Sequence, residues 1–307
     1  MKIDSTKYIL PYLPDILIKS FSKPQTVQQD ITITGSLLFA DLSGFTAISE
    51  RLASLGRLGA EKLAGIINNR FNLLLGVVFA YGGDVIKFGG DAFLAFFSGT
   101  DNTSRAYMCA GDLIHWITEN GRISTPVGDF SLGIHAGISA GDIYNLYIGD
   151  KRKEHLFCGL TVENAYMAAD TAGLGQVALT KHVASSINGI DITELENGFC
   201  ICRKLHKSNK IKFATRQGWD DIFNKSTKPL DENLERFVIN GLKERLNYNA
   251  GVIEGEHRVL TSLFIGVSSL RANLEADSKN SVSAINNYFT CLLYTSDAAD
   301  ELDGVDL

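Results

Sequence analysis

The spacing of apolar side chains changes along the chain and predicts a series of strands and helices. Residues 33–40 form an apolar run that predicts a buried strand. Apolar positions then recur every three or four residues, which predicts a helix over 47–55 and a longer helix over 60–80. Two glycines, Gly82 and Gly83, end the longer helix.

Two short apolar runs follow, 85–88 and 92–97, separated by two glycines and an aspartate. This arrangement is typical of a β-hairpin with a tight turn. The pattern then predicts further elements: a helix over 104–120, strands over 130–141 and 142–148, and a helix over 161–172. The order of these elements predicts an α+β fold, in which helices pack on one sheet.

The parts of the chain outside this central pattern predict the domain organisation. Residues 8–21 are amphipathic, whereas the chain turns polar after about residue 207, with one helical stretch over 231–245. Residues 258–267 begin a new apolar strand, and a helix over 281–289 follows, as in a second copy of the domain that lacks its first aspartate. We therefore divide the chain into an N-terminal segment, a first domain, a linker and the truncated start of a second domain: 1–30, 31–206, 207–254 and 255–290.

The last residues, 291–307, continue no pattern that the domain needs. They begin with CLLYTSDAADE, which looks like a translated sequencing adapter, and the residues that follow fit its continuation. We therefore expect 291–307 to be a non-native tail and the gene to be cut within its second domain.

Composition narrows the class of protein. With 307 residues, of which 45% are hydrophobic, the chain can bury a substantial core. The net charge of −6 and the lack of Lys and Arg clusters argue against a nucleic-acid surface. The longest nearly apolar stretch, 71–81, is too short for a membrane span, and the N-terminus lacks a signal-peptide pattern, so we expect a cytoplasmic protein. The cysteines show no CxxC spacing, so neither disulfides nor structural zinc is predicted: Cys109, Cys158, Cys200, Cys202 and Cys291.

Two aspartates stand at the ends of predicted strands and are candidates for chemistry. Asp41 follows the strand over 33–40, and Asp91 lies between the two hairpin strands. On neighbouring strands their carboxylates could converge and bind Mg²⁺, which prefers a few protein oxygens and keeps waters and substrate phosphates. Taken singly, each aspartate has an ordinary alternative: a helix N-cap for Asp41 and a turn residue for Asp91.

The flanking residues of both aspartates resemble the two metal-site motifs of the class III nucleotidyl cyclases, with the closest likeness to the soluble adenylyl cyclases. The resemblance is carried by FADLSGFTAISE, GGDVIKFGGDAFLAFF, YLPDIL, GIHAGISAGDIYNLYIGD and FCGLTVENAYMAA, at 39–50, 82–97, 12–17, 133–150 and 157–169. It implies a ferredoxin-like, palm-like sheet with helices packed on it. It also implies conversion of ATP to 3′,5′-cyclic AMP and pyrophosphate with two Mg²⁺ or Mn²⁺ ions.

The resemblance assigns roles residue by residue. Asp41, Asp91 and the backbone carbonyl of Leu42 would bind the metals. His135 would reach the terminal phosphates, although a structural histidine is an equal alternative. Lys87 matches a lysine that helps select the purine, or binds bicarbonate in the soluble enzymes. The backbone amides expected to bind phosphate belong to Ser43, Gly44, Phe45 and Thr46.

Other positions depart from the family pattern. Self-sufficient relatives carry an Asn and, four residues later, an Arg that stabilises the transferring phosphate, where this chain has Glu163 and Met167. Leu156 stands at the adenine-selecting position, and Tyr166 replaces the Arg of the bicarbonate site. The chain therefore resembles the metal-donating half of a pseudo-heterodimer, whose missing groups come from the second domain, and the truncated chain alone is expected to be inactive.

Two alternatives remain open at this point. GGDAF at 89–93 resembles the hairpin motif of diguanylate cyclases, although DLSGFT and the repeat of the domain fit that family poorly. A non-catalytic regulatory module that binds nucleotide is the second alternative, because the Asn and Arg are missing. The choice between ATP and GTP also stays open.

Overall fold

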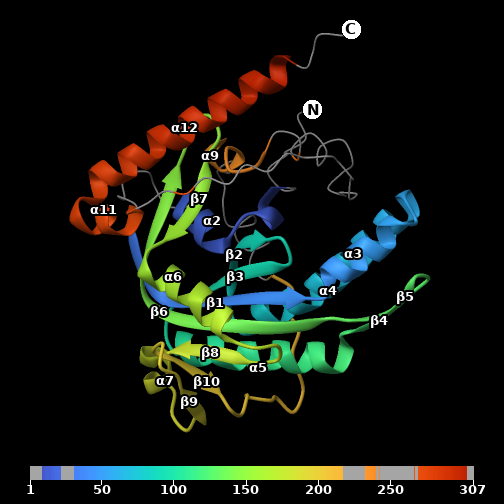
Figure 1. The fold of residues 1–307 in the computed structure, drawn as a ribbon. Helices are drawn as coiled ribbons and strands as arrows, with labels where there is room; N and C mark the ends of the chain where they lie inside the picture. Colours follow the sequence, from blue (N-terminus) through green and yellow to red (C-terminus); the bar gives the residue numbers. More distant parts are fainter. Residues whose placement is uncertain are drawn as a thin grey trace.

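The computed structural model describes residues 9–21, 31–216, 232–239, 242, 266 and 269–302 (Figure 1). Within these residues an eight-stranded sheet has the order β2-β3-β1-β6-β8-β10-β9, and β7 pairs with β6. Its strands are β1 (Thr32–Ser43), β2 (Asp84–Gly89), β3 (Ala92–Phe97), β6 (Gly133–Ile148), β7 (Glu154–Cys158), β8 (Val177–Thr180), β9 (Ile192–Glu194) and β10 (Phe199–Cys202). A separate hairpin joins β4 (Arg122–Thr125) and β5 (Gly128–Ser131).

Strand β1 lies at the centre of the sheet and pairs antiparallel with β3 on one side and β6 on the other. The strand predicted over 33–40 is confirmed and extends further, to Ser43. The predicted hairpin is β2 and β3. The predicted strands over 130–141 and 142–148 were divided at the wrong place: residues 133–148 form the single strand β6, which stays continuous because β1 supplies pairing partners as far as Tyr144.

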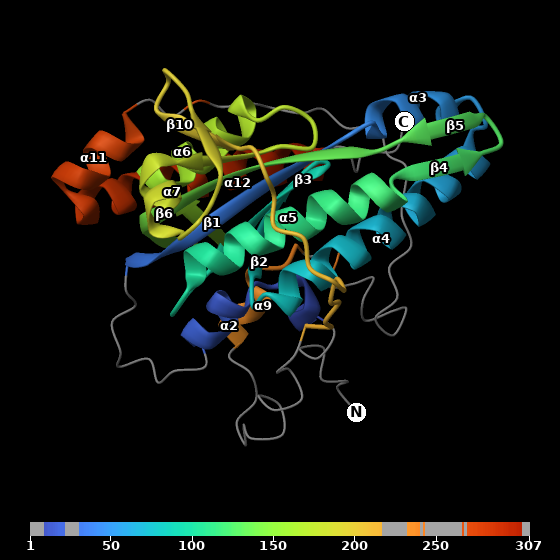
Figure 2. The ribbon, with the colours of Figure 1, turned by 90° about the horizontal axis from the view of Figure 1, so that it is seen from below.

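Helices cover both faces of the sheet, which confirms the predicted α+β fold (Figures 1 and 2). The long helices α4 (Arg57–Ala80) and α5 (Asn102–Asn120) contact each other on one face. Helix α6 (Leu160–Thr171) packs on β1 and β6 from the other face. The remaining helices of the domain are α3 (Phe45–Ala53) and α7 (Lys181–Ser186). The helices predicted over 47–55, 60–80, 104–120 and 161–172 correspond to α3, α4, α5 and α6.

Alternation along β1 separates the two faces. Leu38, Ala40 and Leu42 are buried in the main core beneath α4 and α5. Leu37 and Phe39 belong instead to the apolar cluster that includes α6. Because side chains alternate along a strand, Asp41 lies on the α6 face of the sheet and not in the main core.

Helix α4 is the one helix of the described residues that is long and apolar enough to cross a membrane, with a hydropathy of 1.4. Length and composition alone are weak grounds for a span, since the core helix of a globular domain passes the same test. Phe71, Leu74, Val77 and Val78 on its C-terminal half are buried in the main core. This half of α4 therefore packs as a core helix.

Segments from outside the domain pack on its surface. The predicted amphipathic stretch forms η1 (Leu10–Tyr12) and α2 (Asp15–Phe21), interrupted just before Pro14 because a residue that precedes proline avoids helical geometry. These elements share an apolar cluster with Leu234 of α9 (Glu232–Glu235) and with Val238. The helix predicted over 231–245 is wrong in part: α9 ends at Glu235, and residues 236–239 are not helical. Apart from residue 242, the rest of that stretch lies outside the described residues.

The last described residues form α11 (Leu270–Ala276) and α12 (Ser278–Leu302). Leu274 of α11 packs against Leu146 and Ile148 at the end of β6. The helix predicted over 281–289 lies inside α12. Apart from Gly266, the strand predicted over 258–267 lies outside the described residues. The assignment of 291–307 to a non-native tail stays a prediction.

Gly137 of β6 provides a test of how α6 is held on the sheet. A methyl group at this position would lie 2.2 Å from the backbone nitrogen of Ala169 and 2.3 Å from the carbonyl oxygen of Ala165. We expect Gly137→Ala to lower the free energy of unfolding by about 3 kcal/mol, because backbone atoms of a packed helix cannot move aside cheaply. Chemical denaturation measures this change.

Gly65→Ala is the matched control for that variant. Gly65 lies on the exposed side of α4 with nothing near the added methyl group. Alanine there should raise the free energy of unfolding by up to about 1 kcal/mol, because it favours the helix over the unfolded chain. Equal effects of the two substitutions would contradict the close approach of α6 to β6.

Candidate functional site

Strand pairing brings the two candidate aspartates together at one end of the sheet. Asp41 of β1 lies opposite Ala92 of β3, the residue that follows Asp91. The backbone nitrogen of Leu42 donates a 3.3 Å hydrogen bond to the carbonyl oxygen of Asp91. The predicted adjacency of the two strand ends is therefore confirmed, while the metal-binding role of the aspartates stays a prediction.

The local structure around Asp41 differs from the sequence-based prediction in one respect. The predicted strand ends at residue 40, whereas Asp41, Leu42 and Ser43 still belong to β1. They are held there because β6 continues beside them and pairs Asp41 with His135. The Leu42 side chain is buried in the core, so only its backbone can take part in a site.

A single residue, Gly44, separates β1 from helix α3. Its φ of 100° is in the left-handed region, and a methyl group there would lie 2.6 Å from the carbonyl oxygen of Ser131. Gly44 has no side chain with which to cap α3, and the side chain of Phe45 is buried in the core. The backbone N–H groups at the start of α3 are thus the groups that the predicted phosphate-binding stretch, from Ser43 to Thr46, can offer to an anion.

His135 lies beside Asp41 on the neighbouring strand. The distance between its Nε2 and Oδ2 of Asp41 is 3.7 Å, which is within ion-pair range when the imidazole is protonated. The side chain of His135 is 21% exposed, so it can also reach a ligand. The structure therefore places this predicted residue at the site.

A third carboxylate, Asp170, acts on the site and was missed by the sequence analysis. Burial raises the pKa of Asp41, and the neighbouring carboxylates of Asp91 and Asp170 raise it further, while His135 and the backbone N–H of Leu42 oppose the change. Asp170 lies near the end of α6, seven residues after Glu163 and three after Met167. That helical spacing was the available signal, since residues three, four and seven apart share one face of a helix.

The candidate ligands at this site suit a metal ion that takes most of its other ligands from water and substrate. Among the described residues, no group of three or more His, Cys, Asp and Glu side chains forms a ready-made metal site. Two aspartates and a backbone carbonyl suit Mg²⁺ or Mn²⁺, with water and phosphate oxygens as the remaining ligands. They do not suit a structural zinc site, in which the protein provides all four ligands. The excess of carboxylates around Asp41 also favours a cation there.

Lys87 takes part in a different group of contacts. Its Nζ pairs with Oε1 of Glu154 on β7, and both residues line a cavity of about 220 Å³ together with Tyr12 and His155. Burial, and then the charge of Lys87, lowers the pKa of His155 to about 3, so this imidazole stays neutral. The cavity therefore has no surplus positive charge from these residues with which to hold an anion.

The residues that depart from the family pattern are also located. Glu163 and Met167 are exposed on α6, and Glu163 pairs with Arg271 of α11 at 2.8 Å. Tyr166 is exposed in part, with its ring 4.3 Å from that of Phe39. Neither Glu163 nor Met167 offers a cation or an amide toward the site.

Comparisons with known proteins agree with this geometry. Residues 27–209 match the family described as the adenylate and guanylate cyclase catalytic domain. The chain is 28% identical over 230 residues to adenylate cyclase type 10 of Oryctolagus cuniculus, which covers 73% of this chain and 14% of the relative. It is 27% identical over 226 residues to the Homo sapiens protein of the same name, covering 71% of this chain and 14% of the relative. The chain thus spans about a seventh of the length of these curated relatives.

A solved structure shows the same fold. A bacterial light-regulated adenylyl cyclase aligns with a TM-score of 0.52 and 18% identity, over 74% of this chain and 67% of the other.

Metal titration tests the pair Asp41 and Asp91. We expect Asp41→Asn and Asp91→Asn each to weaken Mn²⁺ binding at least tenfold, because each removes one of the two carboxylates. Loss of a residue that only hydrogen-bonds to a metal ligand already costs ~10-fold in affinity, and loss of a ligand should cost more. Because the pKa of Asp41 is raised, affinity should begin to fall at a higher pH than an ordinary carboxylate would give. Electron paramagnetic resonance of free Mn²⁺ measures both effects.

Asp142→Asn is the control for this titration. Asp142 lies on β6, bonded to Thr34 toward the other end of β1, and its loss should leave Mn²⁺ affinity unchanged. Unaltered binding in Asp41→Asn and Asp91→Asn would refute the metal-site assignment.

Proposed function

The chain belongs to the family of adenylate and guanylate cyclase catalytic domains, and on this premise we propose that it is the metal-binding half of an adenylyl cyclase. The proposed reaction converts ATP to 3′,5′-cyclic AMP and pyrophosphate. The observation that carries it is the convergence of Asp41 and Asp91 beside the first turn of α3. A cytoplasmic location is part of the proposal, since ATP is a cytoplasmic substrate.

The proposed reaction is an in-line displacement that needs no protein nucleophile. The ribose 3′ oxygen forms a bond to the α-phosphorus, the bond from that phosphorus to the bridging oxygen breaks, and the hydroxyl proton passes to water. Divalent ions at this site would lower the pKa of the hydroxyl and offset the charge of the leaving pyrophosphate. Asp41 and Asp91 would hold those ions, while the amides at the start of α3 and His135 would orient the phosphates.

The composition of α6 is the reason for proposing a half-site. Charge that develops on the transferring phosphate needs an aimed cation or amide, and α6 presents Glu163 and Met167 instead. We propose that a second cyclase domain of the same protein supplies these groups. In this chain Arg271, in the stretch assigned to the second domain, contacts α6 through its ion pair with Glu163.

A non-catalytic nucleotide-binding module is the second candidate function. It is favoured by Glu163 and Met167, which stand where an Asn and an Arg are expected. If the second domain also lacked that Asn and Arg, the protein would bind nucleotide without turning it over. A diguanylate cyclase is disfavoured, because residues 27–209 match the adenylate and guanylate cyclase family. The preference for ATP over GTP is proposed from the names of the curated relatives, since Leu156 carries no purine-selecting group.

An activity assay of the 307-residue chain tests the half-site. We expect negligible cyclic AMP from Mn²⁺ and ATP, because removal of one preorganised group alone costs about 100- to 1,000-fold in rate and two are missing here. Metal-dependent ATP binding, measured by calorimetry on the same sample, should remain and should be lost in Asp91→Ala. Robust cyclic AMP production that depends on Asp91 would show that one chain supplies a complete site.

Bicarbonate response of the full-length protein is a further prediction. Burial raises the pKa of Tyr166, so its phenol stays neutral, and the charge of Lys87 is already paired with Glu154. An anion site needs an available cation, so bicarbonate should not activate at fixed pH. Saturable activation in a cyclase assay would contradict this prediction; chloride at equal ionic strength is the control.

A further inference from the structure

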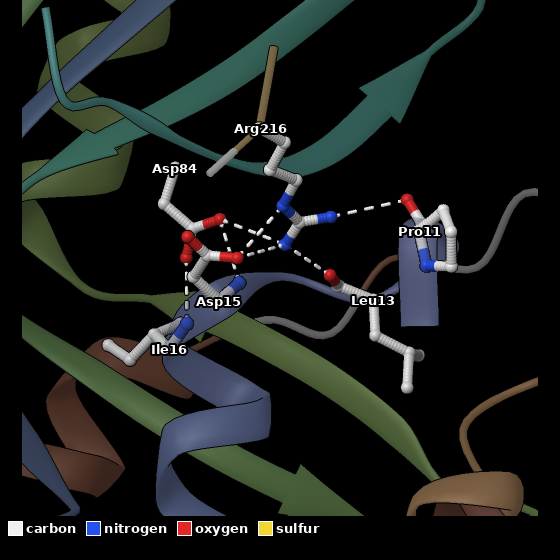
Figure 3. Close-up of polar contacts among 6 residues, drawn as sticks. All are labelled: Pro11, Leu13, Asp15, Ile16, Asp84 and Arg216. Carbon is white, nitrogen blue, oxygen red and sulfur yellow. Dashed lines mark hydrogen bonds and ion pairs between the residues drawn. The ribbon is translucent and has the colours of Figure 1, made fainter. Parts of the chain in front are cut away.

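Two of the motifs in this sequence contain aspartates that the metal site does not use. Asp15 lies in YLPDIL and Asp84 in GGDVIK, and both are drawn in Figure 3 with the arginine that joins them, Arg216. We call Asp15, Asp84 and Arg216 the anchor cluster. Asp84 is the first residue of β2, the strand that leads to the hairpin turn carrying Asp91.

Asp84 fixes the start of α2 to the start of β2. Its Oδ1 accepts a 2.9 Å hydrogen bond from the backbone N–H of Asp15, and its Oδ2 accepts a 2.8 Å bond from that of Ile16. These N–H groups belong to the first turn of α2, where the helix itself provides no acceptor. The carboxylate of one element therefore caps the helix of another.

Arg216 ties the chain that leaves the domain to the same point. Its Nε and Nη2 lie 2.8 and 2.7 Å from Oδ1 of Asp15, and Nη2 lies 3.6 Å from Oδ1 of Asp84. It also donates to the carbonyl oxygens of Pro11, at 3.2 Å, and of Leu13 (Figure 3). One guanidinium thus joins three segments that are far apart in sequence.

The anchor cluster is well shielded from water, so loss of its contacts would leave charged groups without a partner. The side chains of Asp84 and Arg216 are 12% and 16% exposed, and that of Asp15 is 30% exposed. Burial raises the pKa of Asp84 to about 6, and the two N–H donors and Arg216 offset only part of this effect. A shielded carboxylate that loses such partners is strongly destabilised, so removal of either charge should weaken the contacts of the other.

The hairpin needs such an anchor because of its position in the sheet. In the described residues β2 is an edge strand that pairs only with β3, and its ladder is interrupted by an irregularity between Val85 and Lys87. A cavity of about 840 Å³ borders the cluster, so neighbouring side chains do not fully enclose this end of β2. An edge strand is paired on one side only and a ladder irregularity leaves part of it unpaired, so a contact at the end of the strand adds to what holds it in place.

We propose that Asp84 and Arg216 are positioning residues: by fixing the base of the β2–β3 hairpin to the chain that enters and leaves the domain, they set the position of Asp91. Displacement of either segment then alters the metal site without any change in its ligands. The part of this proposal that concerns metal affinity rests on the proposed function. The part that concerns the hairpin does not.

Asp84→Asn tests the proposal, because it keeps the size of the side chain and removes its charge. Amide hydrogen exchange in β2 and β3 should become about tenfold faster, while exchange in β8 stays unchanged, as expected for a local and not a global opening. In the same samples, at a temperature where all are folded, Mn²⁺ affinity should fall about three- to tenfold, below the ~10- to 100-fold loss typical of groups that touch a metal ligand directly.

Two other variants complete the design. Arg216→Lys keeps the charge but loses the forked geometry, and should give a smaller change in the same direction even if Asp84→Asn does not fold. Asp191→Asn breaks the exposed pair of Asp191 with Arg203, at 3.5 Å, and should change neither measurement.

The outcomes separate the two proposals. Faster exchange confined to the hairpin with weaker Mn²⁺ binding supports the positioning role. If the unsubstituted chain binds no Mn²⁺, the proposed metal site fails, and exchange in the hairpin still decides the anchoring role. Equal acceleration in β8 and in the hairpin overturns the proposal, because it shows a global loss of stability. No acceleration in the hairpin also overturns it, because the hairpin then does not depend on the cluster.

Discussion

The register of β1 between β3 and β6 is the constraint on which the rest of the structure depends. It places Asp41 opposite Ala92 on one side and His135 on the other. A shift by one residue would turn Asp41 toward the main core and expose Leu42, so the burial of Leu38, Ala40 and Leu42 fixes the position of the acidic group. The apolar residues that drive folding and the aspartate that offers chemistry therefore lie on opposite faces of one strand.

The two faces of the sheet are used differently. The face beneath α4 and α5 is apolar and closed, and it supplies most of the core. The face beneath α6 holds a smaller apolar cluster, and at its end the carboxylates of Asp41 and Asp170 interact. Because α6 approaches β6 at Gly137, its C-terminal turn lies close to the end of β1. The same close packing that stabilises α6 thus brings a third negative charge to the site.

Much of this could be predicted from the sequence where the local pattern is strong. The long helices and the strand leading to Asp41 follow from apolar spacing, and glycines mark the hairpin that carries Asp91. The short elements β4, β7, β8, β9, β10 and α7 were missed, because stretches of three to six residues carry too little periodicity. Helical spacing was the one available signal for Asp170, and the partner of Lys87, Glu154, had none, because both residues reach their places through packing or pairing over long distances in sequence. The predicted strand stopped before Asp41, because its last residues are extended by pairing with β3 and β6, which apolar spacing does not reveal.

Strand β6 also connects two distant parts of the domain. It runs without interruption from Gly133 to Ile148, roughly 50 Å at the usual rise of a strand. His135 lies near one end, beside Asp41, while Leu146 and Ile148 near the other end receive Leu274 of α11. The strand therefore joins, as one continuous element, the place where α11 packs on the domain to the place where the carboxylates meet.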